Sequence, residues 1–357
     1  MATFRVLSAV EQVVEHLRQE ICRGAWGGMM PGGERLSKEL GIGRGSVERA
    51  LRVLEHEGVL VGQGNRRQRL VELRGGLTPP SLRVGILRFE AADPRLDYMI
   101  ETEHLLLEAG HVPFYAAKTL GDLGMDVRQV ARFIEKNEAD AWVVIAASRE
   151  VLEWFAARRQ PAFALFGRRQ DVVIAGTGPH ATPVMTAIVR RLRELGHHRI
   201  VLLSRRVRRL PHPAQFEQEF LAELDAHGLM VGPYNLPDWE ESRQGLHHML
   251  KSLFHLTPPT AIIVDEQPQF TAVLAFLAGR GIRVPDDVSL VCTDPDRTFD
   301  WCEPQIAHIG WDVSQVARSV SRWASKVARG KDDRLQTLIT AAFVEGGSIG
   351  PVKKGRQ

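Results

Sequence analysis

The stretch that decides the fold is Pro183–Ser204, which reads PVMTAIVRRLRELGHHRIVLLS. Its first part repeats apolar residues at helical spacing, and its last part is a short continuous apolar run of the kind found in buried strands. Gly196 lies between the two parts and is typical of the end of a helix. We therefore expect a helix over Pro183–Leu195 and a strand over Arg199–Ser204.

The same alternation of helix and strand extends outward from this stretch in both directions. Regular alternation predicts parallel sheets covered by helices. The strands are too many for one small doubly wound domain, so we expect an α/β unit of two lobes, with ligands bound at the carboxyl ends of the strands. The further predicted strands are 82–89, 112–116, 141–147, 162–166, 172–175, 261–265 and 288–294, and the further predicted helices are 96–109, 125–137, 149–160, 215–227, 239–254 and 270–280.

The first 75 residues have a different pattern. Apolar spacing predicts helices over Ser8–Arg23, Gly33–Leu40 and Arg44–Gly58. Two short apolar pieces, 59–61 and 70–71, flank a glycine-containing turn and predict a hairpin. Three helices followed by a hairpin are the order of a winged helix-turn-helix, whose third helix enters the major groove of DNA.

The distribution of charge fits this division. The chain has 357 residues and a formal net charge of +3. Residues 1–80 hold 12 basic and 9 acidic side chains, whereas the remainder holds 34 of each. All the excess positive charge therefore lies in the segment predicted to bind DNA, and the positions of the arginines matter more than their number.

Several residues of this segment are candidates for DNA contact. Small Gly45 and Ser46 at the start of the third helix allow close approach to the groove, and Arg44 and Arg49 can reach bases or phosphates. Arg66, Arg67 and Arg69 cluster in the hairpin and can hold the DNA backbone, although a solvated loop explains them equally simply. The predicted DNA-binding residues are Lys38, Arg44, Gly45, Ser46, Arg49, Gln63, Gly64, Arg66 and Arg67.

Glycine and proline mark a domain boundary near residues 75–82. We predict a DNA-binding domain over 1–75, a linker over 76–82, the two-lobed domain over 83–350 and a tail over 351–357. Ordinary apolar and charged content excludes collagen-like and disordered classes. No secretory signal or membrane-length apolar run is seen, and the three cysteines lack metal-ligand spacing, so we expect a cytoplasmic protein with reduced thiols.

One motif favours an enzyme instead. Residues 172–181, VVIAGTGPHA, match the strand and glycine turn of a dinucleotide-binding fold, with Gly176 and Gly178 as the phosphate-binding glycines. Arg205 and Arg206, at the end of the next strand, are placed to hold a 2′-phosphate. Against this, two prolines crowd the loop and several strands precede it. An NADP-dependent oxidoreductase is therefore the alternative from the enzyme class.

Three segments of the N-terminal domain resemble the GntR family of DNA-binding domains: MPGGERLS (30–37), LGIGRGSVERAL (40–51) and LEHEG (54–58). Arg44 falls on the family's first recognition-helix arginine. Gly43 replaces the usual serine cap, which weakens the start of the helix. Glu34 and Glu48 stand where the family has further arginines, so the resemblance does not transfer the DNA sequence that relatives recognise.

The two-lobed part resembles the LacI/GalR family of sugar-responsive repressors. The resemblance rests on LGHHRIVLL (195–203), PPTAIIV (258–264) and GIRVPDDVSLV (281–291), followed by Asp294. It implies two lobes like those of periplasmic binding proteins, joined by crossings near 176–182, 305–309 and 330–340. A GntR-like domain in place of the family's own DNA-binding helices is similar to the hybrid repressors of the arabinose-repressor type.

The resemblance also implies effector-binding residues. Asp294 falls on the family's effector-binding acid, with capping of a turn as the alternative. Asp265 and Glu266 lie at a strand end where the family often has a less acidic pair, which suits a hydroxyl-rich or cationic ligand. Phe216 replaces the family's effector arginine. We expect an exposed basic loop to contain Arg205, Arg206, Arg208 and Arg209, and the alternative is that they substitute for the missing arginine. Trp301 and Phe89 are candidates for contact with the ligand or for core packing.

No catalytic or metal-binding constellation stands out, so we expect neither an enzyme nor a cofactor. The sequence predicts a homodimeric transcription regulator, a repressor, that binds double-stranded DNA and is controlled by a small metabolite, a sugar, between the lobes. A DNA-binding dimer that senses no ligand is the further alternative, because Phe216 leaves effector binding open.

Overall fold

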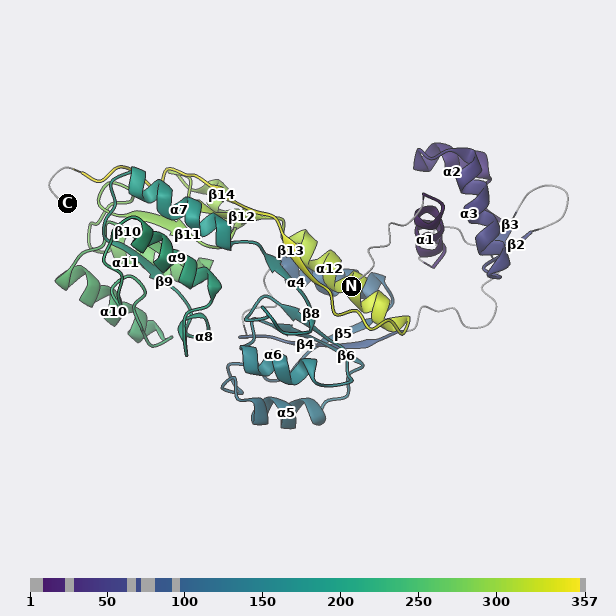
Figure 1. Ribbon diagram of the computed structural model, residues 1–357, viewed down its shortest axis with the longest axis horizontal. Helices are drawn as coiled ribbons and strands as arrows, with labels where there is room; N and C mark the ends of the chain where they lie inside the picture. Colours follow the sequence, from purple (N-terminus) through teal and green to yellow (C-terminus); the bar gives the residue numbers. More distant parts are fainter. Residues whose placement is uncertain (1–8, 23–28, 63–68, 72–80, 92–96, 354–357) are drawn as a thin grey trace.

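The computed structural model describes residues 9–22, 29–62, 69–71, 81–91 and 97–353 (Figure 1). The chain forms a small N-terminal domain and two α/β lobes, as the α/β prediction with parallel sheets required. The predicted linker lies almost wholly outside the described residues. Among the described helices, none combines the length and the apolar character needed to cross a membrane.

The N-terminal domain packs three helices against a small antiparallel sheet. Helix α1 (Ala9–Cys22) contacts α3 (Arg44–His56), and α2 (Gly33–Leu40) also packs on α3. The sheet has the order β1-β3-β2, from Met29–Met30, Arg69–Val71 and Leu60–Gly62. Helical spacing places Val13, Leu17 and Ile21 of α1 in one core with Leu51 and Leu54 of α3. The predicted winged helix-turn-helix is confirmed, and β1 is an addition to it.

Lobe 1 is built on a six-stranded sheet in which every described pair is parallel. One face packs against α4 (Asp97–Glu108) and α12 (Ser314–Ala328), and the other against α5 (Val127–Glu135) and α6 (Arg149–Ala156). The strand order is β13 (Gln336–Ile339), β8 (Ala175–Pro179), β7 (Ala162–Leu165), β6 (Ala141–Ile145), β4 (Arg83–Leu87) and β5 (Val112–Tyr115).

Lobe 2 repeats this layering on five strands. Helices α7 (Thr182–Glu194) and α9 (Gln215–Ala226) cover one face, and α10 (Arg243–Leu256) and α11 (Gln267–Ala278) cover the other. The strand order is β14 (Ala341–Val344), β12 (Ala307–Trp311), β11 (Ser289–Cys292), β10 (Ala261–Val264) and β9 (Ile200–Leu203), with β14 alone antiparallel among the described strands. Short α8 (Arg206–Arg209) and the 3-10 helix η3 (Arg297–Trp301) follow β9 and β11.

The chain crosses between the lobes three times. The first crossing follows β8 and enters α7, and the third passes through Thr340 between β13 and β14, both within the expected ranges. The second differs slightly from the expectation. Strand β12 runs through 307–311 within the sheet of lobe 2, so the chain crosses at Asp312 and Val313, before α12, rather than at 305–309.

The predicted strand 172–175 is wrong. Strand β8 begins at Ala175 and continues through Gly176 and Gly178, which lie between β7 and β13. A Cβ on Gly176 would lie 2.5 Å from the carbonyl oxygen of Ala164, and one on Gly178 would lie 3.1 Å from the Arg169 guanidinium. The glycines therefore give space to close neighbours within a sheet, and their backbone is used in strand pairing rather than in a phosphate-binding loop.

His197, within the stretch Pro183–Ser204, has a structural role. Its ring lies next to the Gly350 carbonyl oxygen and the Ser289 hydroxyl, each 3.0 Å from Nε2. It thereby joins the end of α7 to the start of β11 and to the C-terminal segment. Only 2% of this residue is exposed, and burial lowers the pKa of His197 to about 4.

We expect His197 to make stability depend on pH. Its folded-state pKa lies below the unfolded value of about 6.5, so its contribution is complete above pH 6.5 and is lost as pH falls toward 4. Between pH 7 and pH 5, the free energy of unfolding should fall by about 2 kcal/mol more in the wild type than in His197→Asn. Urea unfolding at each pH measures this difference. The exposed-site variant His255→Asn should behave as the wild type, and equal slopes in all three proteins would contradict the assignment.

Candidate functional site

The first candidate surface is the N-terminal end of α3. Arg44, Gly45 and Arg49 are exposed there, and Ser46 is half-buried. The Arg44 side chain has no hydrogen bond to another described residue, whereas Arg49 donates from Nε to the Gly45 carbonyl oxygen at 3.2 Å. Gly43 caps the helix without a side-chain hydrogen bond, as its lack of a side chain dictates. The helix therefore presents two cations and a small-residue surface to solvent.

The structure explains one departure from the GntR pattern. Glu48 lies 3.1 Å from Arg69, which also donates to Glu55 at 2.8 Å. Arg69 is mostly buried by these contacts, so it attaches β3 to α3 and is not a free phosphate-binding group, contrary to its place in the predicted basic cluster. Lys38 is exposed on α2, with Glu34 4.0 Å away. The other predicted hairpin residues, Gln63, Gly64, Arg66 and Arg67, lie outside the described residues.

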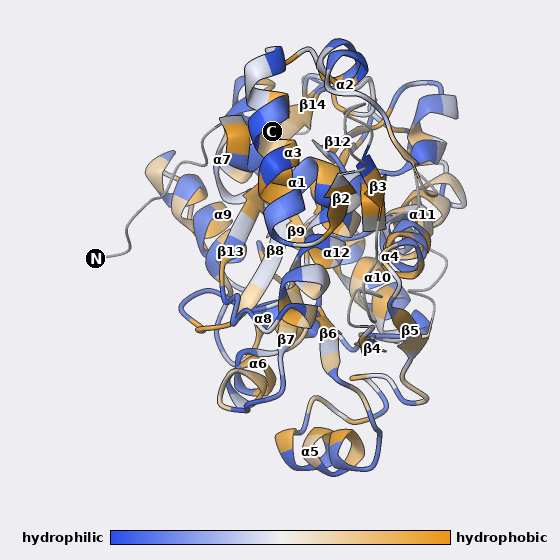
Figure 2. Cartoon of the chain, turned by 90° about the vertical axis from the view of Figure 1, so that its right-hand side faces the viewer, coloured by the Kyte–Doolittle hydropathy of each residue, from blue (hydrophilic) through white to orange (hydrophobic). Residues whose placement is uncertain are grey.

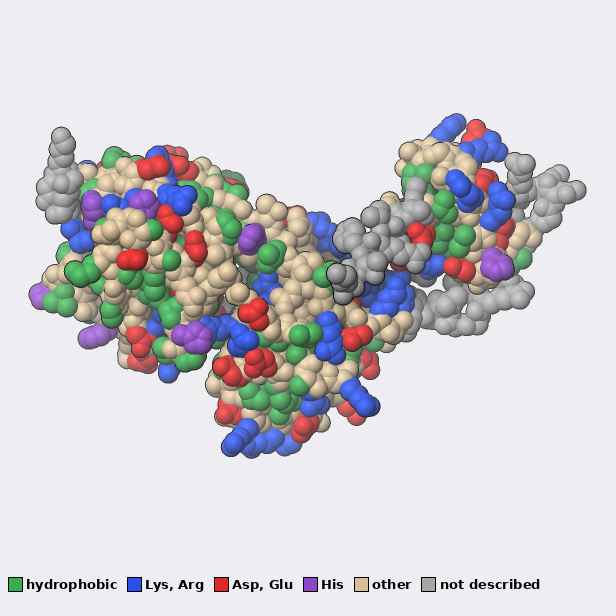
Figure 3. Space-filling model, in the orientation of Figure 1, with side chains coloured by type: hydrophobic (Ala, Val, Ile, Leu, Met, Phe, Trp, Pro, Cys, Tyr) green, Lys and Arg blue, Asp and Glu red, His purple; other side chains and the backbone are tan. Residues whose placement is uncertain are grey.

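The second candidate site lies where the two lobes meet. The carboxyl ends of β9, β10 and β11 in lobe 2 carry charged side chains that approach the end of β4 in lobe 1. Figure 3 shows basic and acidic side chains gathered at the notch between the lobes. We call the following residues the interlobe cluster: Glu90, Arg205, Arg208, Glu217, Glu241, Asp265, Glu266 and Asp294.

Arg205 connects the lobes. Its guanidinium lies 2.9 Å from Glu90 of lobe 1 and 2.5 Å from Glu266 of lobe 2, and it also lies over the ring of Phe89, 5.2 Å from the ring centre. Burial alone lowers the pKa of Arg205, but the hydrogen bond and charge of Glu266, together with Glu90 and Glu241, raise it above its ordinary value. Phe89 thus lies at the surface between the lobes, where it can contact a ligand, which is one of its two predicted roles.

Arg208 lies over Phe216, the residue that stands in the position of the family's effector arginine. Phe216 is buried in the core of lobe 2, and the guanidinium of Arg208 lies 4.8 Å from its ring centre. Arg208 donates to Glu217 at 2.6 Å and to Asp265 at 3.4 Å. The prediction of an exposed basic loop is wrong, because Arg205 and Arg209 are buried and α8 turns the segment inward. Arg209 pairs with Asp238 and donates to backbone oxygens, so it is a structural residue.

The two acids after β10 have different surroundings. Asp265 is buried and accepts hydrogen bonds from the Arg205 backbone at 3.3 Å and from Thr293 at 3.0 Å. Glu266 has a backbone φ of 63° and ψ of 146°, a conformation that is strained for any residue with a side chain. Burial, assisted by the charge of Asp265, raises the pKa of Glu266. A strained backbone that directs an acid toward Arg205 is typical of a functional position.

Asp294 differs from the other acids. It follows β11 and is half-buried, yet its carboxylate makes no hydrogen bond or ion pair with a described residue. Burial and the charges of Asp265 and Glu266 raise the pKa of Asp294 to about 7. The neighbouring acid Asp296, not Asp294, caps η3 by accepting from the Thr298 backbone, so the capping alternative does not apply to Asp294.

Trp301 stands apart from this cluster. It is 91% exposed on η3, which excludes the core-packing alternative, and no described contact brings it to the interlobe cluster. The predicted effector residues therefore divide into two sets. Asp265, Glu266, Asp294 and Phe89 come together between the lobes, with Phe216 beneath Arg208, while Trp301 does not join them.

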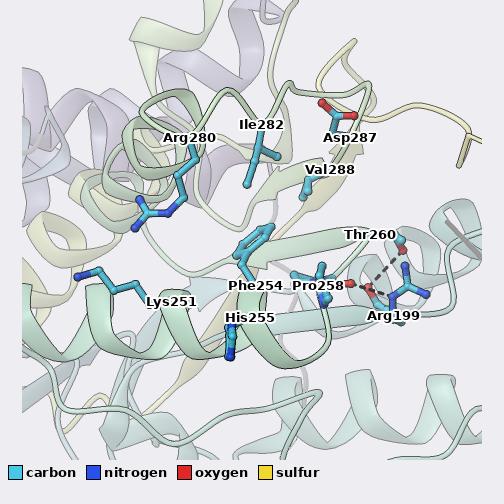
Figure 4. Close-up of a pocket in the computed structure, with 11 residues that line it drawn as sticks. Arg199, Lys251, Phe254, His255, Pro258, Thr260, Arg280, Ile282, Asp287 and Val288 are labelled. Carbon is cyan, nitrogen blue, oxygen red and sulfur yellow. Dashed lines mark hydrogen bonds between the residues drawn. The ribbon is translucent and has the colours of Figure 1, made fainter.

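A separate hollow of about 500 Å³ lies at the opposite, amino-terminal edge of the lobe 2 sheet (Figure 4). Phe254 and Ile282 line it, with Arg199, Lys251 and Arg280 around them. The basic groups lie near the C-terminal ends of α10 and α11, where the helix dipole favours positive charge. The helix dipoles therefore account for the basic groups around this hollow. Across the described chain, no group of three histidine, cysteine or acidic residues could hold a metal ion.

Comparison with protein families assigns both parts of the chain. Residues 9–69 match the bacterial regulatory proteins of the gntR family, and residues 189–349 match the periplasmic binding protein-like domain. The chain joins a GntR-type domain to a periplasmic-binding-protein-like domain. It is therefore a DNA-binding regulator whose second domain has a ligand-binding fold. No curated protein sequence matches the chain.

Solved structures agree with the fold of the second domain. A LacI family transcriptional regulator from Enterococcus faecium with bound ribose is 15% identical, covers 76% of this chain and all of its own, and has a TM-score of 0.60. The structure of the transcriptional regulator CelR in complex with cellobiose is 16% identical, and the match covers 89% of this chain and 100% of that one with a TM-score of 0.61. CcpA of Lactococcus lactis is 11% identical, covers 75% and 99%, and has a TM-score of 0.63. At these identities the likeness establishes the fold.

We expect Arg205 to stabilise the lobes against each other. Arg205→Gln removes a buried charge from Glu90 and Glu266, and should lower the free energy of unfolding by about 1–3 kcal/mol. The neighbouring Arg206 is exposed, so Arg206→Gln should change stability by less than about 0.5 kcal/mol. Urea unfolding of the three proteins measures this. Equal effects of the two substitutions would show that the bridge between the lobes contributes nothing.

Proposed function

We propose that the protein is a cytoplasmic transcriptional repressor whose operator binding is controlled by a sugar held between the two lobes. The observation that carries this proposal is the half-buried carboxylate of Asp294, which has no hydrogen-bond partner in the described chain and lies near Arg205, the residue that contacts Glu90 of the other lobe. Carboxylates accept hydrogen bonds from hydroxyl groups, so a polyol supplies what Asp294 lacks. Ribose and cellobiose in the solved structures of similar fold support this class of ligand.

A ligand between the lobes acts by stabilising one arrangement of them. Arg205 already joins the lobes through Glu90, and Arg168 of lobe 1 donates to backbone oxygens of lobe 2 at Arg208 and Leu210. A sugar that competes for these groups shifts the balance between closed and open lobes. The winged helix is then released from DNA or retained on it according to which arrangement the sugar prefers.

Repressors with one recognition helix per chain bind two half-sites as dimers, and this chain has a surface suited to that. Helix α11 contains no charged residue, although Thr271 and Ala275 are exposed on it. Ile100 and Leu107 are 56% and 54% exposed on α4. Figure 2 shows α4 and α11 on the same side of the molecule. We infer that this side, which we call the α4–α11 face, joins two copies of the chain.

Arg44 provides the test of the DNA-binding role. An operator fragment is first selected from genomic DNA by the purified protein, and its affinity is then measured by fluorescence anisotropy. Arg44→Ala should cost about 1–3 kcal/mol of binding, because it removes an exposed cation from the start of the recognition helix. Arg128→Ala, which removes an exposed cation from lobe 1, is the control. Wild-type affinity in Arg44→Ala would refute the assignment of this helix.

The same anisotropy assay tests control by sugar. Addition of mono- and disaccharides, including ribose and cellobiose, to the preformed complex should change operator affinity for at least one sugar. A change that Asp294→Ala abolishes supports binding between the lobes. If no sugar has an effect while Arg44 remains essential, the alternative of a regulator that senses no ligand is favoured.

The dimer is tested separately by sedimentation. The double substitution Ile100→Asp and Leu107→Asp places charges on the α4–α11 face, and should raise the dimer dissociation constant about a hundredfold. Met230→Asp is the control, because Met230 is exposed after α9 and outside this face. A dimer that tolerates the double substitution would move the interface elsewhere.

A further inference from the structure

The interlobe cluster contains many more acids than bases. Both of its guanidinium groups are engaged: Arg205 contacts Glu90 and Glu266, and Arg208 contacts Glu217 and Asp265. The nearby Arg209 is matched by Asp238 and brings no extra charge. Within the cluster, two guanidinium groups thus serve six acids: Glu90, Glu217, Glu241, Asp265, Glu266 and Asp294. Arg168 of lobe 1 is also nearby, but its guanidinium donates to backbone oxygens at Arg208 and Leu210 and not to these acids.

Asp294 is the acid that this arrangement leaves without a contact. Asp265 and Glu266 raise its pKa by their charges in addition to its burial, and Arg208 and Arg205 oppose them from a distance without forming an ion pair. The thiol of Cys292, in β11, is a further titratable group beside it. Asp294, two residues beyond the end of β11 and close to two other acids, therefore calls for a positive charge as well as hydrogen-bond donors.

Glu217 shows the same shortage independently. It is fully buried, and its Oε1 accepts from Ser204 at 2.8 Å and from Arg208 at 2.6 Å. Its Oε2 is buried without any hydrogen-bond partner. An unsatisfied buried carboxylate oxygen is costly, and Arg208 is already divided between Glu217 and Asp265. The cluster therefore has unsatisfied carboxylate oxygens at Glu217 as well as at Asp294.

We propose that the effector carries a protonated amine that binds against Asp294, so that it is an amino sugar or aminopolyol rather than a neutral sugar. This inference rests on the proposed function, because it assumes that the effector binds between the lobes. An ammonium group offers three donors and a positive charge to the carboxylate, whereas a hydroxyl offers one donor and no charge. The remaining hydroxyl groups of the same molecule face the other acids of the cluster.

The test compares each amine with its neutral counterpart on the wild-type protein. The amines are glucosamine, galactosamine, mannosamine and the acyclic glucamine, and the counterparts are glucose, galactose, mannose and sorbitol. Thermal shift over a concentration series gives the apparent affinity of each ligand. At least one amine should bind about tenfold or more tightly than its counterpart, as expected for a charge-assisted hydrogen bond.

Two variants locate the effect. Asp294→Asn keeps the size of the side chain but removes its charge, and should abolish the preference for the amine. Asp300→Asn, an exposed acid of η3 in the same segment, is the matched control and should retain the preference. If Asp294→Asn does not fold, the comparison of amine with neutral sugar on the wild type still decides the inference.

The other outcomes overturn the inference in distinguishable ways. Equal binding of an amine and its counterpart would show that the site recognises a sugar but not its charge, which leaves the proposed function intact. No stabilisation by any of the four amines would also overturn it. Operator binding by the same protein preparations then tests the proposed DNA-binding function separately from the binding of amines.

Discussion

A guanidinium group held out of water between two lobes is the interaction on which the sensor depends. Arg205 is buried because carboxylates from both lobes accept its hydrogen bonds. Glu90 follows β4 in the sheet of lobe 1 and Glu266 follows β10 in the sheet of lobe 2, so the carboxyl-terminal edges of two sheets supply these acids. The acids of the interlobe cluster outnumber the guanidinium groups that can pair with them. The same set of charges thus joins the lobes and forms the site proposed to bind the effector.

Much of the fold follows from local patterns. The predicted helix Gly33–Leu40 matches α2 residue for residue, and the strand predicted at 261–265 contains β10, because periodicity and short apolar runs are determined by burial. Strand β8 was assigned wrongly because glycines resemble a loop in sequence, yet crowding by Ala164 and Arg169 demands them in the sheet. Edge strands β13 and β14 were not predicted. Strand β13 begins with two polar residues, and the apolar run of β14 is only four residues long.

The residues of the site were predictable only in part. The resemblance to a family pointed to Asp265, Glu266 and Asp294, and named Arg205 and Arg208 as candidates, but nothing in the sequence pointed to Glu90, Glu217 or Glu241. The role of Arg205 depends on Glu90, 115 residues earlier in the chain, and no local pattern records that contact. Arg208 lies over Phe216 from a different helix, a contact that the sequence alone does not reveal. In the DNA-binding domain, the ion pair with Arg69 likewise explains why Glu48 stands where the family has an arginine, and this contact is visible only in the structure.

The three crossings between the lobes have a consequence for how the molecule is made. Strand β13, near residue 339, completes the sheet of lobe 1, and β14 completes that of lobe 2 only five residues later. During synthesis the two lobes therefore stay incomplete until Val344 has emerged, whereas the winged helix is complete at Val71 and can fold first. A nascent chain acquires its DNA-binding part long before it acquires the part that controls it.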